Sequence, residues 1–459
     1  LFHTYPHFRQ SYTFSVNFTR AATMSDAWSI LSGVLVFFMQ SGFAMLEAGC
    51  SRDKNVQSIL MKNMIDVCVG TLGWFAVGFS FAYSFNKKTQ ENPSGYAAGT
   101  GTQIIGGDAA YFLKDSEVDY TSFFFQWTFC ATAATIVSGG VAERVKFSAY
   151  LLYVIVMTTV IYPCIVASTW GGGLFTDVFD DSYVDFAGSG IVHLTGGVGA
   201  LVGAVILGPR TGRFTAESDF HPHSMTLVTL GTLILWMGWF GFNCGSGSTA
   251  QAGLVACNTT VAAASCACMV FVITLIPGVG FAEKDKETDK EKIKLDLGGL
   301  CNGVLAGLVS ITAGCANVLP WEAMIIGFIG GIFYVGSDLL LKKLKIDDPL
   351  NAFPVHGACG MWGLIAVGLF GRIAEHDPPT AVLGSEHEYK ALVPNICLIL
   401  FIWAWCGGIS FIVFGGLHKA NVLRVSVQDE ERGLDKTYHI GDAYNNSPRL
   451  PKYESQGNQ

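Results

Sequence analysis

Long stretches without a charged side chain constrain the fold of this 459-residue chain more than any other feature. A helix needs about 20 mostly apolar residues to cross the hydrocarbon core of a bilayer. Only 14% of the residues are charged, against about 25% in an average soluble domain. The pattern therefore predicts an all-α membrane protein. The windows free of Asp, Glu, Lys and Arg are 27–46, 67–86, 120–142, 147–176, 186–209, 220–281, 297–321, 323–337, 349–371 and 391–418.

Two of these windows need adjustment before they count as membrane spans. The longest, 220–281, contains the helix-breaking run Asn243-Cys244-Gly245-Ser246-Gly247, which divides it into two spans. The short window 323–337 is followed by Asp338 and then by three leucines that extend it to Leu341. We therefore expect eleven transmembrane helices.

The distribution of basic residues predicts the orientation of these helices. An odd number of spans places the two chain ends on opposite sides of the membrane. With the C-terminus inside, the inner loops hold fourteen Lys and Arg, the tail holds six, the outer segments hold seven, and Lys62 lies in a span. Because cytoplasmic loops are enriched in Lys and Arg, the sequence predicts N-out and C-in.

This orientation divides the chain into three parts. Residues 1–25 form an extracellular N-terminal segment without a long apolar run, and its sequon Asn17-Phe18-Thr19 is a predicted glycosylation site. Residues 26–418 form the membrane domain, and residues 419–459 form a polar cytoplasmic tail.

The first ten spans divide into two groups of five that share a histidine motif. The fifth span contains Ile191-Val192-His193-Leu194-Thr195-Gly196-Gly197, and the tenth contains Pro354-Val355-His356-Gly357-Ala358-Cys359-Gly360. An odd number of spans in each unit requires the two units to be inverted in the membrane. We expect repeat one at about 26–209, repeat two at about 224–371, and an eleventh helix at 391–418. Inverted repeats place the substrate path at their interface, near the bilayer midplane.

The two histidines of this motif are the best candidates for function, because an ionisable group at membrane depth is a functional hypothesis by default. A packed histidine bonded to a backbone carbonyl is the simpler alternative for one residue, but two in matching positions favour function. Neutral imidazole both donates and accepts, so two adjacent rings can pass a proton. A membrane haem or redox enzyme, with His193 and His356 as axial ligands, remains an alternative from these residues alone.

Other features exclude or weaken competing functions. The thirteen cysteines lie mostly within spans and form no CxxC pair, which favours packing over metal or redox roles. We therefore expect no metal and no cofactor. A net charge of −8 gives no indication of nucleic-acid binding.

Four motifs follow one another along the predicted spans. They are Gly140-Val141-Ala142-Glu143-Arg144-Val145-Lys146-Phe147-Ser148-Ala149, Asp185-Phe186-Ala187-Gly188-Ser189-Gly190-Ile191-Val192-His193, Gly238-Trp239-Phe240-Gly241-Phe242-Asn243-Cys244-Gly245-Ser246, and Asp347-Asp348-Pro349-Leu350 running on to His356. With these motifs the chain resembles, over about residues 26 to 445, the Amt/Mep/Rh ammonium transporters, and the plant and algal Amt branch in particular. The resemblance implies a transporter rather than an enzyme, multi-pass in the plasma membrane, and a homotrimer with one pore in each subunit.

The resemblance also implies the roles of individual residues. Trp170 and Ser246 match the outer substrate site, with Asp185 as a nearby carboxylate that we expect to cap helix N–H groups. Phe129 and Phe242 match the two rings of a gate, with Phe129 also facing the outer site. His193 and His356 match the pair in the pore. The alternatives are an interfacial anchor for Trp170, core packing for the phenylalanines and a turn for Ser246.

The implied mechanism separates the proton of ammonium from ammonia. A tryptophan face attracts a cation by roughly 0.5–2 kcal/mol, whereas a full charge is costly to move between apolar walls. NH4+ therefore loses its proton below the outer site, NH3 crosses into the cell, and the histidine pair relays the proton. The rival functions are a neutral NH3 or CO2 channel of the Rh type, and an ammonium sensor with little flux.

Three further expectations concern the inner side. Asn351 stands five residues before His356, where bacterial relatives often have Asp; we take it as the counterpart of Asp185, which predicts a lost charge in the second half. Glu143 and Arg144 are expected to form a loop ion pair. Gly433-Leu434-Asp435-Lys436-Thr437-Tyr438-His439 resembles the plant-type regulatory tail, in which a kinase phosphorylates the threonine matching Thr437 and shuts the trimer. A solvated tail is the alternative.

Overall fold

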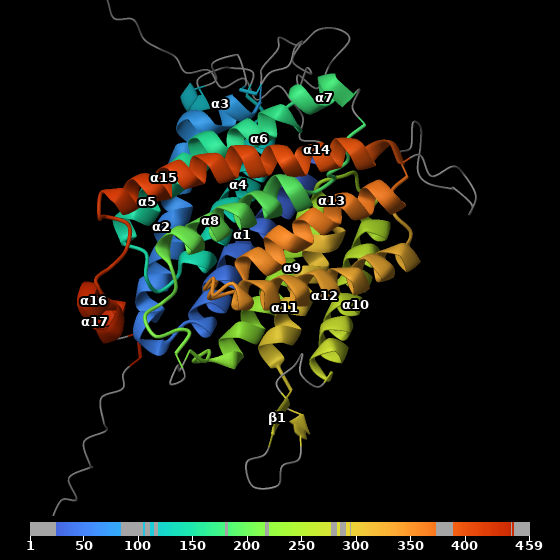
Figure 1. Ribbon diagram of the computed structural model, residues 1–459. Coiled ribbons are helices and arrows are strands. Elements are labelled where there is room, and N and C mark those ends of the chain that lie inside the picture. Colours follow the sequence, from blue (N-terminus) through green and yellow to red (C-terminus); the bar gives the residue numbers. More distant parts are fainter. Residues whose placement is uncertain are drawn as a thin grey trace, which may run out of the picture.

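The computed structural model describes residues 24–83, 104–105, 111–113, 118–179, 182–215, 220–276, 282–284, 291–293, 295–372, 389–441 and 443–444. Within these residues the chain is a bundle of helices (Figure 1). The exception to the expected all-α fold is a small antiparallel pair, β1 (Ala282–Lys284) and β2 (Glu291–Ile293), in the connection before α11. The predicted glycosylation site Asn17 lies outside the described residues.

Several long helices contain a wide π-helical turn. The first half comprises α1 (Met24–Cys50), α2 (Val56–Gly73), η2 (Trp74–Gly78), α3 (Phe79–Ala82), α4 (Tyr120–Val141), α5 (Phe147–Val156), η4 (Met157–Ile161), α6 (Tyr162–Ser168), α7 (Leu174–Phe179), η5 (Ser189–Leu194) and α8 (Thr195–Leu207). The second half comprises α9 (Met225–Gly245), α10 (Ala252–Thr274), α11 (Leu297–Thr312), α12 (Pro320–Lys343), η6 (Phe353–Ala358), α13 (Cys359–Phe370), α14 (Leu392–Ile402), η8 (Trp403–Gly407) and α15 (Gly408–Lys419). Such π-turns frequently occur at functional sites.

The chain is a multi-pass membrane protein by the length and apolar character of these helices. Nine helical stretches among the described residues are long and apolar enough to cross a bilayer. Helix α4, with 22 residues, and helix α11, with 16, occupy the two remaining windows that the sequence predicts as spans.

Charged residues inside two helices make the first spans longer than expected. Helix α1 continues to Cys50, beyond the predicted end at residue 46, and the second span begins at Asp53 rather than at residue 67. Glu47, Lys62 and Asp66 lie within these helices and are at most 2% exposed. Because the predicted spans are windows without a charged residue, these buried charges shortened them.

Glycines allow the helices of the two halves to approach closely. Helix α1 packs along α9, and a Cβ at Gly231 would lie 2.5 Å from the backbone nitrogen of Leu46. A Cβ at Gly238 would lie 2.2 Å from Met39 Cγ. Small residues at helix contacts are typical of membrane bundles, which agrees with the high glycine content of the chain.

A buried ionic cluster joins four connections at one end of the bundle. Arg210 binds Glu143 at 2.8 Å and Asp347 at 2.8 Å, and Arg52 binds Glu143 at 2.5 Å. The expected ion pair between Glu143 and Arg144 is wrong, since Arg144 donates to the carbonyls of Ala142, Gly208 and Asp347 instead. Burial alone would raise the pKa of Glu143, but Arg210 and Arg52 hold it below its ordinary value.

The tail forms two short helices, α16 (Val427–Arg432) and α17 (Leu434–Tyr438), that lie beside the lower end of α2 in Figure 1. The buried Glu430 carboxylate accepts from the Thr211 backbone N–H at 2.7 Å and from Arg424 at 2.8 Å. The Asp435 carboxylate accepts from the backbone N–H groups of Gln57 and Ser58, both at 2.8 Å, and so caps the first turn of α2. This part of the tail is docked, not solvated.

Candidate functional site

The two histidines predicted from the repeat meet in the core of the bundle. His193 belongs to η5 and His356 to η6; they are 0% and 5% exposed. Their Nδ1 atoms are 3.2 Å apart, and their rings are nearly parallel, with centroids 5.2 Å apart. One nitrogen of this bond must carry a hydrogen and the other must accept it, so each ring directs its Nε2 away from the other. No described residue bonds the buried His193 Nε2.

Close contact between two backbones brings the histidines together. Gly197 follows His193 by four residues, and a Cβ there would lie 2.3 Å from the backbone nitrogen of Gly357. Any larger residue at Gly197 would therefore separate the two segments. The shared-motif glycine of the second half, Gly360, is equally confined, since a Cβ there would lie 2.5 Å from the Ser189 carbonyl oxygen.

Matching aspartates cap the two π-helical segments. Asp185, eight residues before His193, accepts from the backbone N–H groups of Gly188, Gly190 and Ile191 at 3.2, 3.0 and 2.8 Å. Asp348, eight residues before His356, accepts from those of Ala352 and Phe353 at 3.0 and 2.8 Å. The expected capping by Asp185 is present in the structure, and Asp348 makes the equivalent contacts in the second half.

Asn351 is therefore not the counterpart of Asp185, and the expected loss of charge is wrong. Asn351 stands five residues before His356, as Gly188 stands five before His193, and both have positive φ, at 55° and 100°. Asparagine tolerates this left-handed conformation better than most residues. Each half keeps a carboxylate and a left-handed residue before its histidine.

Stacked aromatic rings cover the histidine pair on the side of Trp170. Phe129 and Phe242 stack with ring centroids 4.1 Å apart, and both are almost fully buried. Trp170 meets the edge of Phe129 at 6.0 Å, and Phe242 stacks on His193 at 5.3 Å. The predicted outer tryptophan, gate rings and histidines thus form one continuous column.

The remaining predicted outer residues support this column. The half-buried Trp170 fixes its ring by donating from its indole N–H to the Asp185 carbonyl at 2.9 Å. Ser246 directly follows the end of α9, one turn beyond Phe242, and donates to the Phe242 carbonyl at 2.9 Å. Its hydroxyl oxygen therefore remains an acceptor for a donor such as ammonium.

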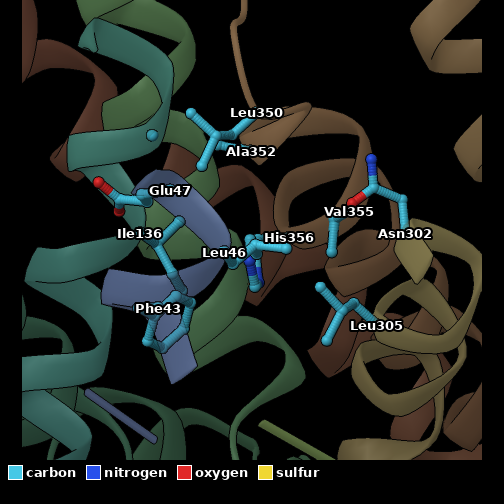
Figure 2. Close-up of a pocket in the computed structure, with 11 residues that line it drawn as sticks. Phe43, Leu46, Glu47, Ile136, Asn302, Leu305, Leu350, Ala352, Val355 and His356 are labelled. Carbon is cyan, nitrogen blue, oxygen red and sulfur yellow. The ribbon is translucent and has the colours of Figure 1, made fainter. Parts of the chain in front are cut away.

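A small cavity is lined by His356 and by residues of α1, separately from the stacked aromatic rings. Figure 2 shows the residues around it, with His356 near the centre and Phe43 and Leu46 of α1 beside it. The cavity has about 20 Å³ of free space, which is room for one molecule the size of water. Its lining is mostly apolar, with Asn302, Glu47 and His356 as the polar members.

Trp239 also contacts the histidine pair, and the sequence alone assigned it no role of its own. Its ring stacks on His193 with centroids 4.9 Å apart and planes 14° apart, and its indole N–H donates to Thr312 Oγ1 at 2.9 Å. The available signal was its position three residues before Phe242, which places both on one face of α9. Trp239 fixes the plane of the His193 ring.

The histidine geometry does not suit axial ligation of a metal. Imidazole nitrogens bind metals such as zinc at about 2.0–2.1 Å, so an ion in line between two nitrogens would hold them about 4 Å apart. The Nδ1 atoms are 3.2 Å apart and share a hydrogen bond. The haem alternative therefore does not fit these two residues.

Comparisons with known proteins identify a matching family. Residues 27–444 match the model of the Ammonium Transporter Family. Ammonium transporter Amt2 of Archaeoglobus fulgidus is 40% identical, covering 94% of this chain and 91% of the relative. Ammonium transporter 1 member 3 of Solanum lycopersicum is 36% identical, covering 93% and 94%.

Solved structures show the same fold. A sensor Amt protein superposes with a TM-score of 0.76 at 32% identity, covering 91% of this chain and 98% of that one. Saccharomyces cerevisiae Mep2 gives a TM-score of 0.76 at 27% identity, covering 90% of both chains. The chain belongs to the ammonium transporter family.

Proposed function

We propose that this protein carries ammonium into the cell by removing a proton from NH4+ and conducting NH3. The outer site is formed by Trp170 and Ser246, with Asp185 holding the Trp170 ring by its backbone carbonyl. Phe129 and Phe242 gate the entrance to the pore, and His193 and His356 relay the proton. The observation that carries this proposal is a bonded pair of buried imidazoles directly beneath stacked aromatic rings.

The apolar column explains why the ion has to lose its proton. Moving a full charge out of water into apolar surroundings costs several kcal/mol or more, and the rings around His193 supply no counter-charge. NH3 has no net charge, and the space beneath His356 has about the volume of one such molecule. The rings of Phe129 and Phe242 must part to admit it. K+ has no proton to release, so it stops above this step.

The proton relay is tested by replacing each histidine. We expect His193→Ala and His356→Ala to lower the ammonium-evoked current under voltage clamp at least tenfold, or to admit K+. The matched control is His418→Ala on α15, outside the pore, which should keep the wild-type current. Wild-type selectivity and current in both pore variants would refute the relay. Methylammonium uptake without dependence on membrane voltage would instead favour the neutral Rh-type channel, and binding without flux would favour a sensor.

We also propose eleven spans with the N-terminus outside and two inverted repeats of five. Nine candidate spans with α4 and α11 give this number. In Figure 1 the tail and the β1–β2 connection lie toward one end of the bundle and α7 toward the other. The extracellular segment 1–25 would then be glycosylated at Asn17. A glycosidase-sensitive mass shift that disappears in Asn17→Gln would support this orientation, and glycosylation of a sequon added to the tail would reverse it.

The docked tail supports a regulatory role in a homotrimer. Thr437 is half-buried and donates to the Gly433 carbonyl at 2.9 Å, within the segment that Asp435 fastens to α2. A phosphate added there by a kinase brings about −1.5 to −2 charges close to the Asp435 carboxylate, which favours release of α17. We expect Thr437→Asp to lower transport severalfold and Thr437→Val to leave it unchanged. Full transport by Thr437→Asp would refute the regulation.

A further inference from the structure

A cluster of buried polar side chains lies beside the pore, and the transport steps described above do not use it. It is formed by Gln40 and Glu47 of α1, Lys62, Asn63 and Asp66 of α2, Thr135 and Ser138 of α4, and Tyr150 of α5. Each of these side chains is at most 8% exposed. Asp, Glu and Lys within membrane helices are rare and commonly mark ion or proton pathways.

Two carboxylates organise the cluster through hydrogen bonds. Glu47 Oε2 accepts from Ser138 Oγ at 2.8 Å and from Asn63 Nδ2 at 3.2 Å. Asp66 Oδ2 accepts from the Tyr150 hydroxyl at 2.7 Å and from Thr135 Oγ1 at 3.1 Å. The two acids therefore have similar chemistry but separate partners.

The cluster also contains polar atoms that no described residue satisfies. Lys62 Nζ, Asp66 Oδ1, Asn63 Oδ1 and Gln40 Nε2 are buried without a hydrogen-bond partner. An unpaired buried ammonium is particularly costly, and Lys62 is 1% exposed. Buried polar atoms of this kind are typically satisfied by bound water. The unsatisfied donors and acceptors of this cluster are therefore suited to binding water molecules.

Glu47 is the one acidic member that reaches the pore. It lines the cavity that also contains His356, and Phe43, one turn earlier on α1, packs near the His356 ring at 6.2 Å. Figure 2 shows the Glu47 carboxylate turned away from His356, toward the neighbouring helices. Direct transfer between the two groups is therefore excluded in this arrangement, but the cavity holds about one water-sized molecule. Asp66 does not line it.

We propose that Glu47 is the proton acceptor on the inner side of the histidine pair. This inference rests on the proposed deprotonation of ammonium. An N–H bond of protonated His356 breaks and its proton passes to a water in the cavity, while that water gives one of its own protons to Glu47. An O–H bond forms on the carboxylate, and Glu47 then releases the proton to bound water toward the cytoplasm. NH3 continues through the pore without it.

The test measures charge and substrate in the same cells. Uptake is measured with radiolabelled methylammonium, as an ammonium analogue, while the current is recorded under voltage clamp. The ratio of the two gives the charge moved for each molecule taken up. We expect Glu47→Gln to keep uptake within about twofold of wild type and to lower the charge-to-uptake ratio at least fivefold. Asp66→Asn is the matched control, because it makes the same acid-to-amide change within the cluster but outside the cavity, and it should keep the wild-type ratio.

A second variant keeps the test possible if Glu47→Gln misfolds. If Glu47→Gln does not reach the cell surface, the double variant Glu47→Met/Lys62→Met removes both buried charges at once, since apolar replacement of opposite buried charges is often neutral or stabilising. It should show the same low ratio. An unchanged ratio would overturn the role of Glu47 while leaving deprotonation at the histidines intact. Equal losses of current and uptake in a surface-expressed variant would also overturn it. No ammonium current in the wild type would instead refute the proposed function itself.

Discussion

Replacing Asp347 by asparagine tests whether the buried ionic cluster fastens the ends of the helices. The Asp347 side chain is 2% exposed and receives Arg210 Nε at 2.8 Å, Arg210 Nη2 at 3.0 Å and the Arg210 backbone N–H at 2.9 Å. Arg213 adds a longer contact at 3.3 Å. Asparagine has nearly the same shape, but one of its two acceptor oxygens becomes an NH2 group that faces these donors.

The expected loss of stability follows from what Arg210 retains. Breaking a buried ion pair by removing one partner costs about 3–5 kcal/mol, because the other charge remains buried. Arg210 keeps its bond to Glu143 at 2.8 Å, so the low end of this range applies. About 3 kcal/mol corresponds to roughly a 150-fold change in the unfolding equilibrium.

The assay is denaturant unfolding of the purified protein in detergent, followed by tryptophan fluorescence. Asp338→Asn is the matched control, since Asp338 pairs with Lys342 at 2.7 Å and the Lys342 side chain is 47% exposed. Exposed pairs of this spacing contribute only about 0.3–0.5 kcal/mol. Equal effects of the two substitutions would refute the conclusion that burial makes the Asp347 cluster important.

Acid should remove the same stabilisation without a mutation. Burial raises the pKa of Asp347, but the hydrogen bonds and charge of Arg210 outweigh it and hold the pKa below its ordinary value of 3.8. A carboxylate with a depressed pKa stabilises the fold fully above its unfolded pKa and loses that contribution as the pH falls toward the folded pKa. The stability difference between wild type and Asp347→Asn should therefore shrink below about pH 4, and a constant difference down to pH 2 would contradict this explanation.

Three further substitutions test the site and the tail. Gly188→Ala places a Cβ 2.7 Å from Val192 Cγ2 and 3.0 Å from the Trp170 ring, at a residue with positive φ. It should lower the free energy of unfolding by about 1–3 kcal/mol and weaken methylammonium uptake. Asn351→Gly, which keeps the positive φ, should be tolerated. Trp239→Leu removes the ring stacked on His193 and should lower uptake at least severalfold at normal surface expression. Asp435→Ala removes the cap of α2, at about 1 kcal/mol, and should make the tail more sensitive to limited proteolysis.

The sequence predicted the membrane fold and the central pair because both depend on local patterns. Long apolar runs locate helices without knowledge of their neighbours, and the shared Val-His-x-x-x-Gly pattern identified His193 and His356 as equivalent. Their contact at 3.2 Å depends on the crossing at Gly197 and Gly357, which no local pattern specifies. Spatial neighbours from other helices, such as Trp239 against His193, are difficult to assign for the same reason.

The error at Asn351 arose from comparing residue types rather than positions. Counting back eight residues from each histidine gives Asp185 and Asp348, and counting back five gives Gly188 and Asn351. The first pair supplies carboxylates to N-terminal N–H groups, and the second pair adopts positive φ. Asparagine and glycine are thus equivalent at this position, because the position requires a positive backbone φ angle and not a charged side chain.

The buried charges of α1 and α2 explain why charge-free windows gave the first two spans too short. A charge-free window assumes that every residue of a span faces lipid or an apolar neighbour, yet Glu47, Lys62 and Asp66 face polar groups from α4 and α5. Such residues occur in a membrane helix when polar groups of neighbouring helices surround them. Ionisable groups retained against that cost are candidates for proton chemistry. Among the three, Glu47 is the residue that lines the cavity beside His356, and for this reason we propose Glu47, and not Lys62 or Asp66, as the group that takes up the proton.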